Sequence, residues 1–174
     1  MDNFNIWNTY KRTSYQTITG TIRQIRSMRE RGGGACSQFV TVEDTSGNVT
    51  NFVVNPSTYV ADAATMYRGM QAHFIYNADL PVPLIYPPQF TAVAVVSTII
   101  ASNVAAGWFG SRLVNADNTL QLNLTDGVPV VTSNNQVFQG SPGGNYLIVM
   151  YERSTRSIPA QTTPERVVVM CEWN

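Results

Sequence analysis

A short segment that occurs twice constrains the fold of this chain more than any other feature of its sequence. Tyr86-Pro87-Pro88-Gln89 and Ile158-Pro159-Ala160-Gln161 each place an apolar residue before proline and a glutamine shortly before a β-branched run. A repeat of this kind indicates a duplicated structural unit. Because proline has no N–H for a sheet ladder, each copy is predicted to form a corner that leads into the last strand of its unit. The predicted corner residues are Pro87, Pro88, Gln89, Pro159 and Gln161.

Alternating and β-branched segments around the first corner predict a unit of five strands. These strands are expected at residues 17–25, 36–43, 49–54, 70–76 and 90–97. Gly20 inside the first of them predicts a bend or a bulge. Residues 58–68 are expected to contain a short helix that ends at Gly69.

The second half of the chain follows the same plan, with strands expected at residues 104–113, 119–124, 128–131, 145–151 and 166–172. A polar stretch, 132–144, takes the place of the helix. Five strands with an insertion between the third and the fourth fit the OB barrel, a five-stranded Greek-key barrel. The sequence therefore predicts an all-β fold of two tandem five-stranded OB-like Greek-key barrels. The predicted parts are an extended N-terminal arm at 1–16, a first domain at 17–100 and a second at 101–174.

The charge content is unusual for a soluble domain. Asp, Glu, Lys and Arg make up 13% of the chain and the formal net charge is zero, whereas a typical domain has about 25% charged residues. Neutral proteins tend to associate. Lys11 is the one lysine among eleven basic residues, and interfaces favour arginine over lysine. Zero net charge argues against nucleic acid as the main partner, and no apolar run approaches the roughly 20 residues of a membrane span.

The N-terminal arm is rich in aromatic residues, whereas disordered tails are usually poor in them. We expect the arm to pack against its own domain or against a neighbouring copy, as in strand addition to a sheet edge. The residues predicted to make this self-assembly contact are Phe4, Ile6, Trp7 and Tyr10.

Few residues suggest chemistry. His73, the one histidine, lies inside an expected strand and is interpreted as structural. Cys36 and Cys171 cannot form a disulfide framework; two buried thiols are favoured, and a single bridge is left open. One histidine and two separated cysteines cannot assemble a zinc site from N and S ligands. We therefore predict no catalytic, cofactor-binding or metal-binding residues and no enzymatic activity.

A second group of residues suggests a different function. Single-stranded nucleic acids bind OB barrels through a basic groove with stacking aromatic rings. The basic candidates are Arg23, Arg26, Arg29 and Arg31, and the stacking candidates are Phe39, Phe52, Trp108 and Phe109. Glu30 interrupts the basic run and the second unit has no equivalent, so an exposed loop or a contact with a neighbouring subunit is the preferred interpretation.

Three segments carry a resemblance to a known family. Residues 52–59, 83–89 and 155–164, which include both corners, are similar to segments of a largely uncharacterised family from anaerobic bacteria. The likeness extends from about Tyr15 to Met170. It implies tandem OB-like domains and self-assembly into extracellular tubes or filaments, and it transfers no catalytic residues.

These observations predict a structural subunit that polymerises into an extracellular filament or tube through homotypic contacts. Low charge, the excess of arginine and the aromatic arm motivate this prediction. The N-terminus lacks the apolar core of a cleavable signal peptide, so an extracellular or cell-surface location is expected without a visible export route, and a cytoplasmic location stays open. The alternative is an OB-type binding module for an oligosaccharide or a single-stranded nucleic acid.

Overall fold

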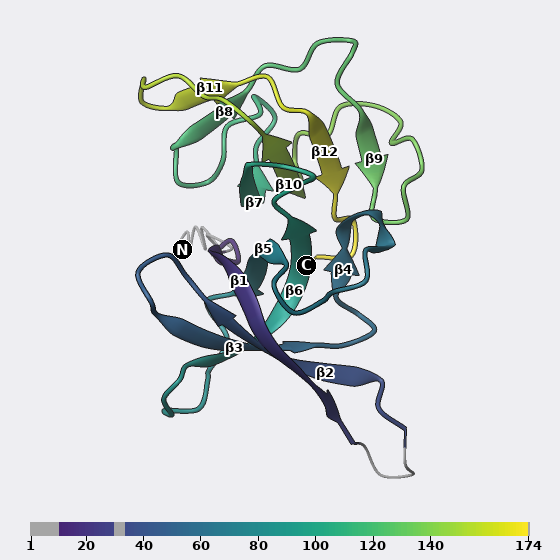
Figure 1. Ribbon diagram of the computed structural model, residues 1–174. Helices are drawn as coiled ribbons and strands as arrows, with labels where there is room; N and C mark the ends of the chain where they lie inside the picture. The colour runs from purple at the N-terminus through teal and green to yellow at the C-terminus, as the bar shows by residue number, and fades with distance from the viewer. Residues whose placement is uncertain (1–10, 30–33, 174) are drawn as a thin grey trace, which may run out of the picture.

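The computed structural model describes residues 11–29 and 34–173. The arm residues Phe4, Ile6, Trp7 and Tyr10, together with Arg31, lie outside the described residues. The fold is all-β: across the described ranges the one helical element is a three-residue 3-10 turn, η1 (Ala61–Ala63). Figure 1 shows two units, the N-terminal one below and the C-terminal one above.

The strands of both units are mostly short, as expected for small β-domains. The first unit contains β1 (Tyr15–Met28), β2 (Ser37–Glu43), β3 (Val49–Val54), β4 (Tyr59–Val60), β5 (Gln71–Asn77) and β6 (Gln89–Ser97). The second unit contains β7 (Asn103–Phe109), β8 (Leu120–Leu122), β9 (Val130–Thr132), β10 (Asn145–Tyr151), β11 (Ala160–Thr162) and β12 (Arg166–Val169).

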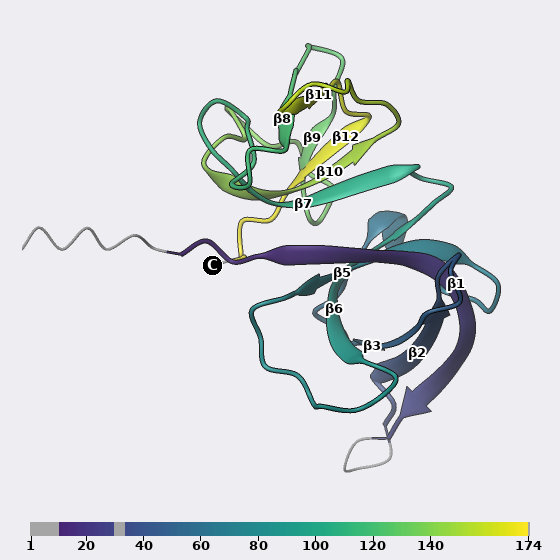
Figure 2. The same cartoon turned by 90° about the vertical axis from the view of Figure 1, so that its left-hand side faces the viewer.

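The first unit is a closed five-stranded barrel, as the sequence predicted. β1 pairs antiparallel with both β2 and β5, β2 pairs with β3, and β5 pairs with β6. A parallel pairing between β3 and β6 closes the ring. Figure 2 shows that the 14-residue β1 curves strongly around this ring. The expected irregularity is present as a register shift between Ile22 and Gln24, just beyond Gly20.

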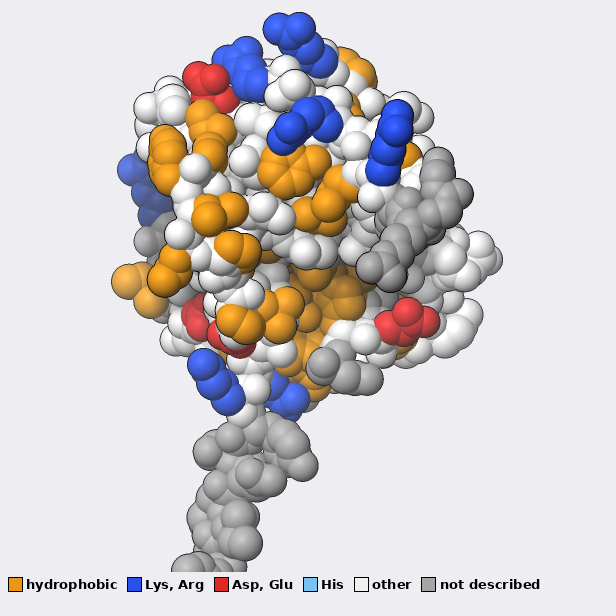
Figure 3. Space-filling view, turned by 90° about the horizontal axis from the view of Figure 1, so that it is seen from below, with side chains coloured by type: hydrophobic (Ala, Val, Ile, Leu, Met, Phe, Trp, Pro, Cys, Tyr) orange, Lys and Arg blue, Asp and Glu red, His pale blue; other side chains and the backbone are white. Residues whose placement is uncertain are grey.

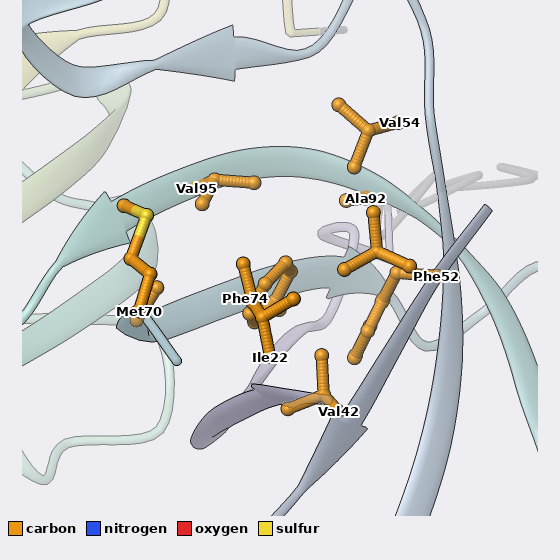
Figure 4. Close-up of a cluster of buried hydrophobic side chains, with 10 residues drawn as sticks. Ile22, Val42, Phe52, Val54, Met70, Phe74, Ala92 and Val95 are labelled. Atoms are coloured by element: carbon orange, nitrogen blue, oxygen red, sulfur yellow. The ribbon is translucent and has the colours of Figure 1, made fainter. Parts of the chain in front are cut away.

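Apolar side chains from all five barrel strands fill its interior. Phe52 and Phe74 stack at its centre with their ring centroids 4.8 Å apart, and both are fully buried. The side chains labelled in Figure 4 come from strands on different sides of the barrel and lie together in this interior. Alternation of buried and exposed residues along β2 and β3 places one face of each strand inside.

The helix predicted at 58–68 is wrong except for η1. Tyr59 and Val60 instead form β4, which pairs parallel with β6. Asp62 and Ala63 have left-handed backbones, with φ of 56° and 51°, so a right-handed helix cannot continue through them. Gly69 adopts a φ of +94° at the end of this connection.

The second unit differs from the prediction of a second barrel. Its strands form an open four-stranded sheet in the order β7-β10-β12-β9 and a separate pair, β8 with β11. Within the described residues, this unit does not close. Pro164 lies between β11 and β12, and since proline cannot donate a ladder hydrogen bond, it splits the strand that is continuous as β6 in the first unit.

The strand registers nevertheless repeat between the units. Asn51 of β3 lies opposite Gln89, and Gln121 of β8 lies opposite Gln161, in parallel pairings of the same kind. Likewise β9 pairs parallel with β12 as β4 does with β6. The segment 119–124, predicted as the second strand of its unit, therefore corresponds to the third strand of the first barrel.

The counterpart of β2 is reduced to a short turn in the second unit. Two isolated bridges remain there, Phe109 with Asn115 and Val114 with Gln121. The connection between β7 and β8 consists mostly of turns, with Leu113 and Asn118 at positive φ, so the ring stays open on this side.

The two units share an apolar interface. Along β10, Leu147 and Val149 point into the second unit, whereas Tyr146, Ile148 and Met150 belong to a cluster that includes residues of β5 and β6. This explains why the centre of β10 is an uninterrupted apolar run: both of its faces are buried.

Candidate interaction surface

The described part of the arm lies against the second unit. The Arg12 guanidinium carbon lies 3.6 Å from the centroid of the Trp108 ring, a cation–π contact. The backbone N–H of Thr13 donates to the Tyr146 hydroxyl at 3.0 Å. The arm root, residues 11–14, is therefore held on β7 and β10 before the chain enters β1.

The same segment also contacts the loop that follows β5. The Ser14 N–H donates to Asp79 Oδ2 at 2.9 Å, and the Ala78 N–H donates to the Ser14 carbonyl at 2.9 Å. Lys11 lies 3.8 Å from the Asp79 carboxylate with its side chain largely exposed, so this ion pair adds little stability.

Four aromatic rings form a cluster beside the arm root. Tyr15 stacks on Trp173 with centroids 4.3 Å apart and meets Tyr146 edge-on at 5.6 Å. Trp108 meets Tyr146 edge-on at 5.2 Å. These rings come from the start of β1, from β7 and β10, and from the C-terminal tail, so only the folded chain brings them together. Sequence reasoning missed this aromatic cluster; the tryptophan next to the chain end was its one local signal.

Burial determines the ionisation of Tyr15. Desolvation, followed by the effects of Tyr146 and Asp79, raises the pKa of Tyr15 to about 12. The phenol therefore stays neutral well above physiological pH.

A groove of about 460 Å³ opens beside the cluster. Its walls are Trp108, Tyr146, Trp173, Met170 and Cys171, with the arm root along one side. We call it the aromatic groove. Its size falls within the roughly 300–1,000 Å³ of typical ligand pockets, and its lining suits apolar or aromatic groups.

A second feature is an exposed apolar loop between β5 and β6. Five large apolar side chains stand in solvent within seven residues: Leu80, Val82, Leu84, Ile85 and Tyr86. Leu84 is 102% exposed and Tyr86 is 84% exposed. Apolar residues gathered in this way mark interaction sites more often than isolated ones do. Figure 3, which views the first unit from below, shows several groups of exposed hydrophobic side chains, with Lys and Arg side chains around them.

The two predicted corners occupy equivalent places. Tyr86–Pro87 and Ile158–Pro159 are both cis peptide bonds. Each corner is followed at once by a parallel pairing, of Gln89 with β3 and of Gln161 with β8.

Backbone bonds hold both corners. The Pro88 carbonyl accepts from the Asn51 N–H at 2.9 Å, and the Ala160 N–H donates to the Thr119 carbonyl at 3.0 Å. The apolar residue before each cis bond points outward, since Ile158 is 90% exposed, much like Tyr86. The corners thus display apolar tips in addition to turning the chain.

His73 is held on both ring nitrogens. Nδ1 lies 2.7 Å from Thr19 Oγ1, and Nε2 lies 2.8 Å from the Ala101 carbonyl. The carbonyl can only accept, so Nε2 carries the proton and Nδ1 accepts from the threonine hydroxyl. Desolvation by burial lowers the pKa of His73. The neutral ring joins β1, β5 and the connection between the units.

The prediction of two buried thiols is wrong. Cys36 and Cys171 are both exposed and free. They lie in different hollows: Cys171 lines the aromatic groove, whereas Cys36 lies beside Val54 and Met66.

The structure does not bring the basic and aromatic residues considered for nucleic-acid binding together into one site. Phe52 and Phe109 are fully buried, so they cannot stack on a base. Phe39 stays half-buried on β2, with Arg26 4.9 Å above its ring. Arg23 is paired with Glu43 at 3.1 Å. Arg12 covers one face of the Trp108 ring.

No group of three or more His, Cys, Asp or Glu residues that could hold a metal ion occurs among residues 11–29 and 34–173. Over the same ranges, no helix is long and apolar enough to span a membrane.

Comparison of the chain with protein-family models, with curated proteins and with solved structures gives no match. The surface is therefore interpreted from its own chemistry.

Proposed function

We propose that the protein is a structural subunit that associates with copies of itself into an extracellular filament or tube. The exposed apolar loop carries this proposal, because its five large side chains would gain burial in a contact between copies. The low charge supports it too, since little electrostatic repulsion opposes association at zero net charge.

The placement of the apolar tips favours a polymer over a closed dimer. Tyr86 belongs to the first unit and Ile158 to the second, so each unit displays one exposed apolar tip. Contacts between unlike surfaces of successive copies produce open helical assemblies when the rotation does not close. The repeated strand registers support reading both units as OB-like, the second with one strand reduced.

Replacement of the loop tips tests the proposal. The double variant Leu84→Asn/Tyr86→Asn is expected to raise the concentration needed for assembly about a hundredfold or more, because each of the two lost apolar burials is worth about 1.5–3 kcal/mol. Light scattering and negative-stain electron microscopy measure the assembly. The control is Val137→Asn, which changes a 73% exposed apolar residue elsewhere. Wild-type protein that stays monomeric at high concentration, or a loop variant that assembles normally, contradicts the proposal.

An OB-type binding module is the second candidate. The Arg26–Phe39 pair on the outer face of β2 favours single-stranded nucleic acid. A groove of about 470 Å³ between the units, which includes Tyr59, Asn134 and Arg166, offers polar groups suited to an oligosaccharide. Binding of labelled oligonucleotides that weakens steeply with salt, or retention on a glycan array, would favour this function over assembly.

A further inference from the structure

We propose that the aromatic groove of one copy binds the N-terminal arm of a second copy. This inference rests on the proposed function and names the contact that would join successive subunits. The occupant is the segment 1–10, with Phe4, Ile6, Trp7 and Tyr10 as its apolar side chains.

The chemistry of the groove matches that of the arm. Trp108, Tyr146 and Trp173 provide aromatic walls, and Met170 provides a polarizable apolar side chain. Thioethers and aromatic rings both make favourable contacts with incoming aromatic groups. Lys11 and Arg12 stand at the rim, opposite in sign to Asp2, the one charged side chain within residues 1–10.

The place where the arm begins indicates a second copy. Lys11, Arg12 and Thr13 themselves line the groove, so the segment 1–10 starts at its rim. To fill its own groove, the chain would have to reverse within a few residues and pass back over Arg12, whose guanidinium already lies on Trp108. The arm of another copy enters without such a reversal.

The available length is sufficient for this exchange. An extended chain covers at most about 3.3–3.6 Å per residue, so ten residues reach up to about 33–36 Å from the rim. Counted from Lys11, Trp7 can therefore reach about 13–14 Å and Phe4 about 23–25 Å toward a groove on an adjacent molecule. The groove has room for one or two large side chains. Binding of the arm by a second copy would therefore bury one or two of its side chains rather than the whole arm.

Cys171 provides a native reporter, because its exposed thiol lines the groove. One copy carries Asn8→Cys with Cys36→Ser and Cys171→Ser, which leaves a single thiol beside Trp7. A size-tagged second copy carries Cys36→Ser and keeps Cys171. Mild oxidation of the mixture is expected to give a disulfide-linked pair of unlike size on a non-reducing gel. The matched control partner carries Cys171→Ser and keeps Cys36, the other exposed thiol, which lies in a different hollow.

The outcomes distinguish the two proposals. A several-fold higher yield with Cys171 than with Cys36 supports the exchange. Equal yields overturn it, and so does a link formed within one diluted chain that carries both Asn8→Cys and Cys171, because the occupant is then the chain's own arm. Polymers without the Cys171 link overturn this inference and leave the proposed function standing. The absence of both polymers and links overturns both.

Discussion

His73 shows how one residue acquires its role from the fold. In the sequence it is an isolated histidine in a strand, and the structural interpretation follows from the lack of partners for catalysis. The folded chain gives it two hydrogen bonds, to Thr19 and to the Ala101 carbonyl.

Gly20 is a second residue whose role depends on the fold. A Cβ added there would lie 2.6 Å from the Glu43 carbonyl oxygen, so the close approach of β1 to β2 requires glycine.

The titration of His73 leads to a prediction at the residue scale. Its pKa is lowered in the folded protein, so the unfolded chain, with an ordinary pKa of about 6.5, binds more protons below that pH. Stability should therefore fall as the pH drops from about 6.5. Urea unfolding between neutral and mildly acidic pH measures this fall.

His73→Gln is the matched variant, because an amide can donate to the Ala101 carbonyl but does not titrate. Its stability should be lower at neutral pH and should change less as the pH falls through this window. His73 is the one histidine in the chain, so no other imidazole contributes. A variant with the full pH dependence of the wild type would assign the effect to carboxylates instead.

At the scale of elements, β10 connects the two units. Its alternating side chains serve two clusters, with Ile148 facing the first unit. A second link crosses the same junction, where Arg166 donates to Asp62 Oδ1 at 2.7 Å and to Oδ2 at 3.4 Å. The apolar contact should contribute more to the stability of the junction than the ion pair, since the Arg166–Asp62 pair is partly exposed.

Paired substitutions test this ranking. Ile148→Ala should lower the free energy of unfolding by about 2–5 kcal/mol, because it removes a fully buried side chain. Asp62→Asn, which also tolerates the left-handed backbone at this position, should lower it by less than about 1 kcal/mol, as for most exposed ion pairs. Chemical unfolding followed by tryptophan fluorescence and by circular dichroism measures both. Equal effects would mean that polar contacts, not apolar packing, hold the units together.

At the scale of the whole molecule, the proposed assembly would involve three parts of the surface: the arm, the aromatic groove and the apolar loop. The arm root connects them, because it lies on Trp108 and Tyr146 and bonds to Asp79 at the start of the loop. Because the arm root makes these contacts, residues 1–10 can be removed to test their role in assembly without losing those contacts.

Deletion of residues 1–10 should abolish ordered assembly while leaving the melting temperature close to that of the full chain. The contacts of Arg12, Thr13 and Ser14 remain in this variant, so the barrel keeps its attachment to the second unit. Electron microscopy and differential scanning calorimetry measure the two properties. Truncated protein that polymerises as well as the full chain would remove the arm from the mechanism; a large fall in melting temperature would show instead that the segment stabilises its own subunit.

Local sequence patterns predicted the all-β class, most of the first-unit strands and the two corners, and the structure contains them. These depend on side-chain alternation and on proline chemistry, which act over a few residues. The tertiary structure decided which strands pair, and therefore that Pro164 and a short turn leave the second unit open. It also decided that the loop at Leu84 stays exposed and that Tyr15, Trp108, Tyr146 and Trp173 meet. Those outcomes depend on contacts between residues distant in the chain, which no local pattern encodes.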